Sequence, residues 1–195
     1  MNNRSNFMPS INSILFLPLF LLLFSFDGDK KELREYDEKK ELTWDDYKAR
    51  PNKASSFKAL TVTRTSFSAN SDGKLLQLTV QNYFEPQSSW TKTDKNQELL
   101  DHERLHFHIS ELFARKLRKQ ILQTKFKSKA QKVMDEISKM YEVNIRELTK
   151  FQRLYDRETD HSIAVKEQKN WEAKIRSELA DLHEFSNPVL EISLK

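Results

Sequence analysis

Apolar residues recur every three or four positions through most of the second half of the chain, which is the period of an α-helix. The first segment with this spacing carries Leu105, Ile109, Leu112 and Leu117. Neither Gly nor Pro interrupts it, and just upstream Asp94 with Gln97 resembles an N-cap and its capping-box partner. The pattern therefore predicts a long helix that contains the stretch from Leu99 to Leu117.

The same spacing predicts two further helices, up to about Phe185. The second carries Val133, Ile137, Met140, Leu148, Phe151 and Tyr155, and the third carries Ala164, Gln168, Trp171, Ile175, Leu179 and Leu182. Ser128 with Gln131 offers a capping box, so the first helix should end near Lys127. Since the first two predicted helices are similar in length, packing them antiparallel would return the end of the second to the start of the first.

Alternation of apolar and polar residues predicts β-strands before the helices. Leu60–Phe67 is rich in Thr, Val and Phe, and a second run alternates Leu76, Leu78, Val80 and Phe84 with Gln77, Thr79 and Gln81. The turn signal Asn70-Ser71-Asp72-Gly73 separates the two runs. We expect an antiparallel hairpin with one buried face, and an edge strand or a frayed tail at Val189–Leu194.

The expected fold class is α+β, with an N-terminal antiparallel β-hairpin or small sheet packed on a bundle of three long helices. A chain of 195 residues can form one domain with a sizeable core. We assign this domain to residues 42–195. It begins with LTWDDY, in which Thr43 and Asp46 form a capping box for one short helical turn whose aromatic residues should be core anchors.

The N-terminal residues 1–26 differ in kind from the rest. Arg4 precedes the apolar run ILFLPLFLLLF at Ile14–Phe24. As a helix, Ile11–Phe26 would measure about 24 Å, short of the roughly 30 Å hydrocarbon core of a bilayer. The segment is predicted to be a secretory signal peptide, with an uncleaved membrane anchor as the alternative because no A-x-A-like cleavage site follows. We therefore expect a secreted or periplasmic protein, and the absence of Cys excludes disulfides.

The charged residues suggest a solvated surface rather than a nucleic-acid interface. Residues 27–41 contain the run KKELREYDEKK and are expected to form a mobile linker. The formal net charge of +4 comes from basic residues that are interleaved with acidic ones. Only Arg115–Lys129 approaches a basic stripe, and we interpret it as an exposed helical face, so no nucleic-acid partner is expected.

His102, Glu103 and His106 spell H-E-x-x-H inside the first predicted helix. Residues four apart lie on one helix face with β-carbons about 5–6 Å apart, so both imidazoles can reach one ion. Zn²⁺ suits this spacing, since its bonds to imidazole nitrogen are about 2.0–2.1 Å long. Glu103 lies to the side of the pair, where it can take a proton from the attacking water. The alternative is a pair of surface histidines on a charged helix.

Catalytic zinc needs a third protein ligand and an open fourth position. The metzincin class would require Gly at position 109 and His at position 112, where this chain has Ile109 and Leu112, so that class is excluded. A Glu ligand could come from the second helix, where the candidates are Glu136, Glu142 and Glu147. These residues precede the point at which the second helix returns to His102.

The segment Tyr155–His161 is better placed to supply the third ligand. The antiparallel packing brings it back to the H-E-x-x-H pair, and His161 offers a neutral imidazole where two helices join. His108 is closer in sequence but lies about 200° round the helix from His106. His183, late in the third helix, is expected to be a surface or packing residue.

These motifs resemble a known family, the bacterial secreted proteins that are predicted to be zinc-dependent proteases and are grouped as domain of unknown function 922. The resemblance covers roughly Leu42 to Leu182. It is carried by LTWDDY at Leu42–Tyr47, Tyr83-Phe84, Ser89-Trp90, LLDHERLHF at Leu99–Phe107 with Glu111, YDRETDH at Tyr155–His161, and Gln168 with Trp171. It implies that His102, His106 and His161 are the zinc ligands and that Glu103 is the base.

Two positions depart from the family pattern. His108 stands where Asp is expected after the H-E-x-x-H-F motif, which could remove a carboxylate that orients a ligand. Ser162 stands where Gly usually follows the last His, which places a Cβ at a turn. Neither change touches a proposed ligand, so they bear on the geometry of the site more than on metal binding.

The expected function is a secreted zincin-type metallopeptidase that acts on a peptide or protein substrate. Glu103 would take the proton of the attacking water and deliver it to the leaving amine. Tyr155 could donate a hydrogen bond to the oxyanion, or it could pack in the core. The rival is a non-catalytic cell-envelope protein with a structural or decayed zinc site. A fourth protein ligand such as His108 or Asp160 would favour that rival.

Overall fold

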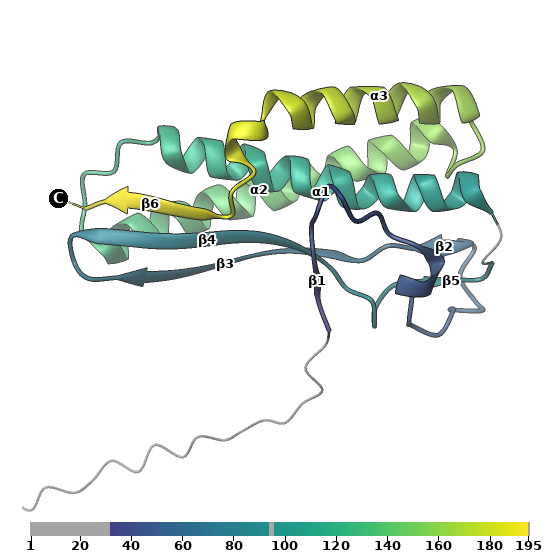
Figure 1. Cartoon of the computed structure of the whole chain (residues 1–195), viewed down its shortest axis with the longest axis horizontal. Coiled ribbons are helices and arrows are strands. Elements are labelled where there is room, and N and C mark those ends of the chain that lie inside the picture. Colours follow the sequence, from purple (N-terminus) through teal and green to yellow (C-terminus); the bar gives the residue numbers. More distant parts are fainter. Residues whose placement is uncertain (1–31, 94–95, 195) are drawn as a thin grey trace, which may run out of the picture. The chain divides into compact units, whose positions relative to one another are not determined.

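The structure is a computed structural model and describes residues 32–93 and 96–194. Its elements are β1 (Arg34–Glu35), β2 (Ala59–Leu60), β3 (Thr63–Ser71), β4 (Leu75–Phe84), β5 (Trp90–Thr91), α1 (Gln97–Gln123), α2 (Ala130–Thr159), α3 (Val165–Asp181) and β6 (Val189–Ser193), with 3₁₀ turns at Trp44–Asp46 and His183–Phe185 (Figure 1). The predicted α+β class, with a small antiparallel sheet and three long helices, is confirmed. The predicted signal peptide or anchor at residues 1–26 lies outside the described residues.

Strand β4 is the centre of the larger sheet. It pairs with the whole of β3 through the predicted hairpin, from Thr63 opposite Phe84 to Ser71 opposite Leu76. The tight turn between them contains Gly73 at φ +89°, a left-handed conformation that glycine adopts without strain. The other edge of β4 pairs antiparallel with β6 at one end and with β1 at the other. The C-terminal segment is therefore an edge strand, the first of the two predicted alternatives.

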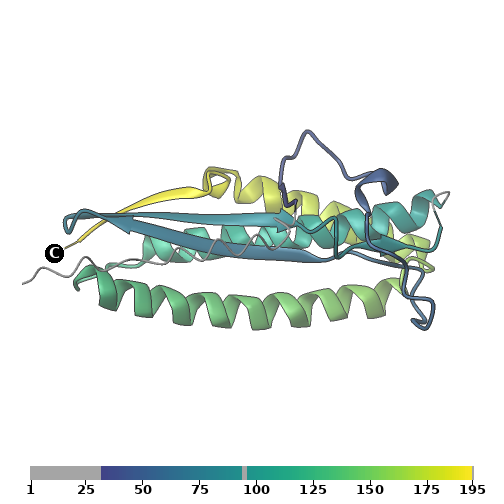
Figure 2. The same cartoon turned by 90° about the horizontal axis from the view of Figure 1, so that it is seen from below.

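Helix α1 is the central element of the fold. All three helices lie on one face of the sheet, and α1 contacts β3 and β4 as well as α2 and α3 (Figures 1 and 2). Between helices the core contains Leu105, Ile109, Leu112, Tyr155, Trp171 and Ile175, and between helices and sheet it contains Leu76, Leu78, Val80, Leu117, Ile121, Val133 and Ile137. Each fully buried Leu or Ile contributes about 1.5–3 kcal/mol. This packing fixes the position of α1, which carries the H-E-x-x-H motif.

The helix ends differ slightly from the prediction. Asn96 caps α1, because its side chain accepts a hydrogen bond from the Leu99 N–H at 2.8 Å. Asp94, the predicted N-cap, is outside the described residues. The predicted cap of α2 at Ser128 is wrong, since the chain is still extended at Lys129 and the helix begins one residue later without a side-chain cap.

The predicted charged linker at residues 27–41 needs correction over its last part. Strand β1 pairs with β4, and the ring of Tyr36 packs edge-on against Phe107 with centroids 5.2 Å apart. Arg34 pairs with Asp46 at 2.6 Å. Residues 34–41 therefore belong to the folded domain, which begins before residue 42. Glu38 and Glu41 contact Arg115 and His108 on α1, partners that composition alone does not reveal.

The basic stretch Arg115–Lys129 is only in part the exposed face that was predicted, because Lys125, Lys127 and Lys129 are exposed but the two arginines are buried. Arg115 and Arg118 are 2% and 1% exposed, and both guanidinium groups bind Glu111 Oε1, at 3.1 Å and 2.8 Å. We call Glu111, Arg115 and Arg118 the buried charge cluster. Arg115 also donates to the carbonyl of Leu179, and Arg118 donates to that of Val80, at 2.8 Å and 2.9 Å. The cluster thus joins α1 to α3 and to the sheet.

No helix in the part of the chain that the structure describes has both the length and the apolar character needed to cross a bilayer.

Candidate metal centre

The start of α1 and the end of α2 lie side by side, as the antiparallel packing predicted. The His102 and His106 rings, four residues apart on α1, have centroids 4.9 Å apart. Asp156 Oδ1 lies 3.3 Å from His102 Nε2, 2.9 Å from His106 Nε2 and 3.8 Å from His161 Nδ1. All three predicted histidines therefore lie around one oxygen of Asp156, a residue that was not predicted as a ligand. Ligand atoms of His102, Asp156 and His161 lie within 4.8 Å of one another, a group that does not include His106.

A strained turn directs His161 toward the other histidines. Asp160, His161 and Ser162 have φ angles of 46°, 50° and 82°, so three consecutive residues other than glycine are left-handed. Each such residue costs on the order of 1 kcal/mol. The His161 N–H donates to the carbonyl of Asp156 at 3.0 Å, and its ring packs on Phe57 with centroids 5.2 Å apart. The turn reverses the chain directly after α2 and returns the imidazole to the site.

Replacing Ser162 by Gly is expected to raise the free energy of unfolding by about 1 kcal/mol, because glycine adopts φ 82° without the clash of a Cβ. Zinc affinity should not change, since the Ser162 side chain is no candidate ligand. Urea unfolding of the metal-free protein measures the effect. Ser162→Ala is the matched control because it keeps the Cβ, and equal stability of the two variants would show that the turn is not strained at this residue.

Hydrogen bonds fix the orientation of His102. Its Nδ1 lies 3.2 Å from Gln168 Oε1, and the Gln168 amide nitrogen donates to Glu172 at 2.9 Å. Because a carboxylate only accepts hydrogen bonds, Glu172 holds the amide with its nitrogen outward and its oxygen toward His102. The His102 Nδ1–H then donates to Gln168, which leaves Nε2 free to bind a metal. His106 has the equivalent contact, with Nδ1 2.6 Å from Gln152 Oε1.

Tyr155 supports the histidines from inside the core. Its ring stacks on His102 with centroids 4.6 Å apart, and the residue is fully buried. Its hydroxyl donates to Gln168 Oε1 at 2.8 Å and lies 3.1 Å from the His102 carbonyl oxygen. The hydroxyl is thus engaged in the core and does not line the cavity at the histidines. This geometry supports the packing alternative for Tyr155 rather than contact with an oxyanion.

Electrostatics favour a charged Asp156 among the imidazoles. Burial raises the pKa of the Asp156 carboxyl, but hydrogen bonds from His102 and His106 outweigh it and hold the pKa well below its usual range. Burial lowers the pKa of His106. The hydrogen bond to Asp156 and the charge of Glu103 raise this pKa by more than burial lowers it, so the net shift is upward. Protons therefore compete with any metal for these nitrogens.

Glu103 has an unsatisfied oxygen at the same place. The residue is 4% exposed, and its Oε2 is buried without a hydrogen-bond partner among the described residues. It lines a cavity of about 460 Å³ together with His102, His106, Gln152, Asp156, Asp160, His161 and the segment from Ser56 to Thr61. Imidazole nitrogens with a carboxylate are the donor set that zinc prefers, and the free oxygen of Glu103 can accept from a water there. These residues fit a zinc ion.

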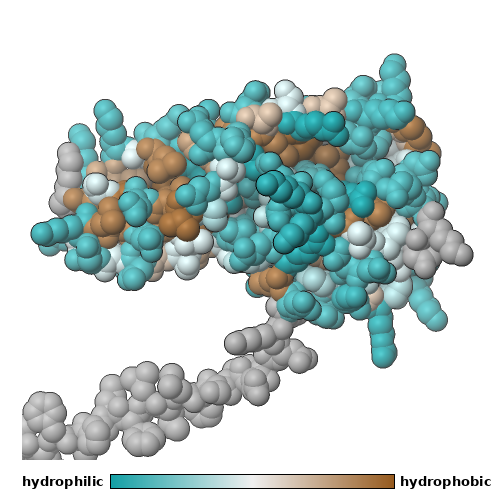
Figure 3. Space-filling model, in the orientation of Figure 1, coloured by the Kyte–Doolittle hydropathy of each residue, from teal (hydrophilic) through white to brown (hydrophobic). Residues whose placement is uncertain are grey.

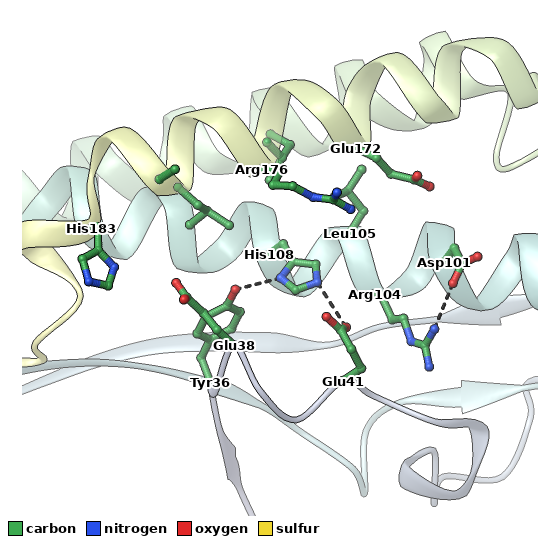
Figure 4. A pocket seen from close by; sticks show the side chains of 13 residues that line it. Tyr36, Glu38, Glu41, Asp101, Arg104, Leu105, His108, Glu172, Arg176 and His183 are labelled. Atoms are coloured by element: carbon green, nitrogen blue, oxygen red, sulfur yellow. Dashed lines mark hydrogen bonds and ion pairs between the residues drawn. The ribbon is translucent and has the colours of Figure 1, made fainter.

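The other candidate ligands lie elsewhere. His108 Nδ1 bonds the Tyr36 hydroxyl at 2.8 Å, and its Nε2 lies 3.3 Å from Glu41 (Figure 4). His108 does not line the cavity of His102 and His106. Asp160 lines the cavity, and no contact joins it to the histidine nitrogens. The remaining carboxylates from the second helix, Glu136, Glu142 and Glu147, are exposed on α2 and do not line the cavity.

A larger cavity, of about 740 Å³, lies between residues 36–41, α1 and α3 (Figure 4). Apolar surface is visible below α3 in Figure 3, framed by hydrophilic side chains. His183 lines this cavity, and two of its acidic residues are already paired, Asp101 with Arg104 at 2.9 Å and Glu41 with His108. Among the described residues, a group of ligand atoms within 4.8 Å of one another occurs only at His102, Asp156 and His161. We therefore take the smaller cavity as the candidate site.

Comparison with known proteins gives one match. The family model described as "Bacterial protein of unknown function (DUF922)" matches residues 39–162, a segment that contains His102, Glu103, His106, Asp156 and His161. No curated protein and no solved structure matches the chain. Because the family model covers more than half of the 195 residues, the chain belongs to the bacterial family DUF922, whose function is unknown.

Proposed function

We propose that the protein is a zinc-dependent, zincin-like metallopeptidase. The observation that carries this proposal is the buried Oε2 of Glu103, which has no hydrogen-bond partner among the described residues, in a residue that lines the same cavity as His102, His106 and His161. Leaving a buried acceptor unsatisfied costs about 1–3 kcal/mol, so such an atom requires an explanation. A general base explains it, because the free oxygen is where the proton of a water is received during hydrolysis. A purely structural zinc site has no use for this oxygen.

In the proposed hydrolysis, the residues that line the cavity have different roles. His102, His106 and His161 would hold Zn²⁺, and the bound ion supplies Lewis-acid polarisation and lowers the pKa of water. Glu103 takes the proton of the attacking water and gives it to the leaving amine. Gln168 and Gln152 orient the two imidazoles of α1 through their Nδ1 atoms.

A structural zinc site is the second candidate, and Asp156 favours it. Asp156 Oδ1 lies within 3.8 Å of a nitrogen on each of the three histidines. Four protein ligands would close a tetrahedral site and leave no position for water. In the peptidase, Nε2 of His102 and of His106 would bind the metal and carry no proton, so the Asp156 carboxylate would have to turn away from them and leave the fourth position to water.

The proposed substrate is a peptide or protein outside the cytoplasm. This location rests on the apolar segment near the N-terminus, which is followed by a polar chain and fits a signal peptide or an anchor. An uncleaved segment would attach the enzyme to the membrane.

Metal removal tests the proposal. The purified full chain is expected to contain one zinc ion and to cleave members of a diverse peptide library, as read by mass spectrometry. A chelator should abolish cleavage and added zinc should restore it, because the attacking water loses its activation without the ion. Bound zinc without any cleavage would favour the structural site.

Gln168→Ala is expected to weaken zinc binding about 10- to 100-fold, because His102 loses the acceptor that directs its Nε2 to the metal. Competition with a fluorescent zinc chelator gives the dissociation constant. Lys169→Ala, an exposed neighbour on α3, should bind zinc like the wild type. Unchanged affinity in Gln168→Ala would show that the amide does not orient the ligand.

A further inference from the structure

The wall of the cavity that faces the ligands is apolar and exposed. Phe57, Leu60 and Ile163 line it and are 48%, 39% and 68% exposed. They come from two separate segments, the chain around β2 and the loop between α2 and α3. Large apolar side chains that gather at one exposed cavity mark a binding surface, since ligand sites combine apolar walls with a few placed polar groups.

The backbone of β2 offers hydrogen bonds at the same wall. Among the described residues β2 pairs only with β5, and the Lys92 N–H donates to the Lys58 carbonyl at 2.8 Å. Pairing alternates along an antiparallel ladder, so Lys58 and Leu60 direct their N–H and C=O groups toward β5 and Ala59 directs its own groups away. Ala59 is 6% exposed but lines the cavity, and its backbone groups pair with no strand on this side among the described residues. A peptide that enters the cavity can add there as a further strand, whereas a lipid chain cannot satisfy these groups.

We propose that the cavity binds an extended peptide along β2 and seats one bulky apolar side chain of that peptide, such as Phe or Leu, against Phe57, Leu60 and Ile163. The inference rests on the proposed function for the class of ligand, and it adds a preference for large apolar residues. Phe57 packs on His161 with ring centroids 5.2 Å apart, so the apolar surface begins directly beside a metal-ligand candidate. The seated side chain therefore belongs to a residue close to the bond that is cleaved.

Peptide binding to the zinc-loaded Glu103→Gln protein tests the inference without depending on hydrolysis. The probes are two labelled alanine-rich peptides, one with a central Phe and one with a central Ser, and fluorescence anisotropy gives their dissociation constants. The Phe peptide is expected to bind at least about 10-fold more tightly, because a large apolar side chain is buried. Adding Ile163→Ser or Leu60→Ser should reduce this ratio at least fivefold.

The matched control is Val143→Ser on α2. Val143 is 49% exposed, a fraction similar to that of Phe57, but it does not line the cavity. The ratio of the two dissociation constants should therefore stay unchanged in this variant. Ile163 and Leu60 are exposed, and the ring that packs on His161 is that of Phe57. Replacing Ile163 or Leu60 should therefore leave the zinc content equal to that of the parent protein.

The inference would be overturned if the Ser and Phe peptides had nearly equal dissociation constants. It would also be overturned if the Phe peptide kept its full advantage in both Ile163→Ser and Leu60→Ser. Binding to phosphatidylcholine vesicles that falls in Ile163→Ser while the peptide ratio stays constant would assign the surface to lipid and overturn it as well. Hydrolysis by the wild type without a preference for apolar residues would support the proposed peptidase activity and refute only the apolar subsite. A Phe preference in binding without any hydrolysis would support the subsite and count against the peptidase.

Discussion

Replacing Glu103 by Gln is expected to leave zinc bound and to lower the rate of peptide hydrolysis at least about 100-fold. The amide has the same size and can still accept a hydrogen bond through its oxygen, but it cannot take a proton from water. Melting should stay near that of the wild type, because Oε2 has no partner to lose in the described part of the chain. Hydrolysis is to be compared at equal zinc occupancy, on a peptide that the wild type cleaves.

Glu98→Gln provides the matched control for this prediction. Glu98 is an exposed residue in the first turn of the same helix, outside the cavity, and the chemical change is identical. Its activity should equal that of the wild type. If Glu103→Gln hydrolyses peptides at the wild-type rate with full zinc, Glu103 is not the base. If it loses zinc instead, the carboxylate helps to hold the metal and the division of roles is incorrect.

The second large effect concerns stability. Glu111→Gln is expected to lower the free energy of unfolding by about 3–5 kcal/mol, because two buried guanidinium groups lose the carboxylate that neutralises them. Arg115 would keep Glu38, whereas Arg118 would keep only carbonyl partners such as Val80. Urea denaturation followed by circular dichroism measures the difference.

A partly exposed ion pair between α1 and α3 is the control. Glu178→Gln breaks the pair between Lys116 and Glu178, whose side chains are 39% and 31% exposed, and should cost at most about 1 kcal/mol. If Glu111→Gln does not accumulate, adding Arg118→Gln should restore part of the stability, because it removes the charge left without a counter-ion. Similar small costs for Glu111→Gln and Glu178→Gln would contradict the proposed importance of the buried charge cluster.

The helices and the hairpin could be predicted because their signals are local. The helical recurrence of Leu105, Ile109 and Leu112 and the alternation along β4 both depend on neighbours within a few residues. Strand β1 has no such signal. It consists of Arg34 and Glu35, and it is a strand only because β4 offers an edge there. Arg115 and Arg118 were misplaced for a related reason, since the sequence shows a charge but not its partner across the fold.

The candidate site could be predicted in part. The spacing of His102 and His106 indicates a shared face, and antiparallel packing together with the family resemblance indicates His161. Asp156 was missed, although Gln152 and Asp156 repeat on α2 the four-residue spacing of the histidines on α1. Two polar residues at that spacing on an apolar helix face could have revealed a polar surface opposite the histidines. Glu172 could not be found in this way, because it acts through Gln168 and only the packing of α3 brings the two to His102.

The position of α1 determines how the stability of the protein would depend on the proposed zinc ion. In a zinc finger the ion creates the fold, so apo-protein is unfolded and binding free energy is spent on ordering the chain. Here the sheet, α2, α3 and the buried charge cluster fix α1 without any ion. The metal-free protein should thus be a folded, reloadable form. Zinc binding would then add to the free energy of unfolding only by mass action, about 1.4 kcal/mol for each tenfold rise in free zinc above the dissociation constant. The melting temperature of the protein would therefore rise with the concentration of free zinc.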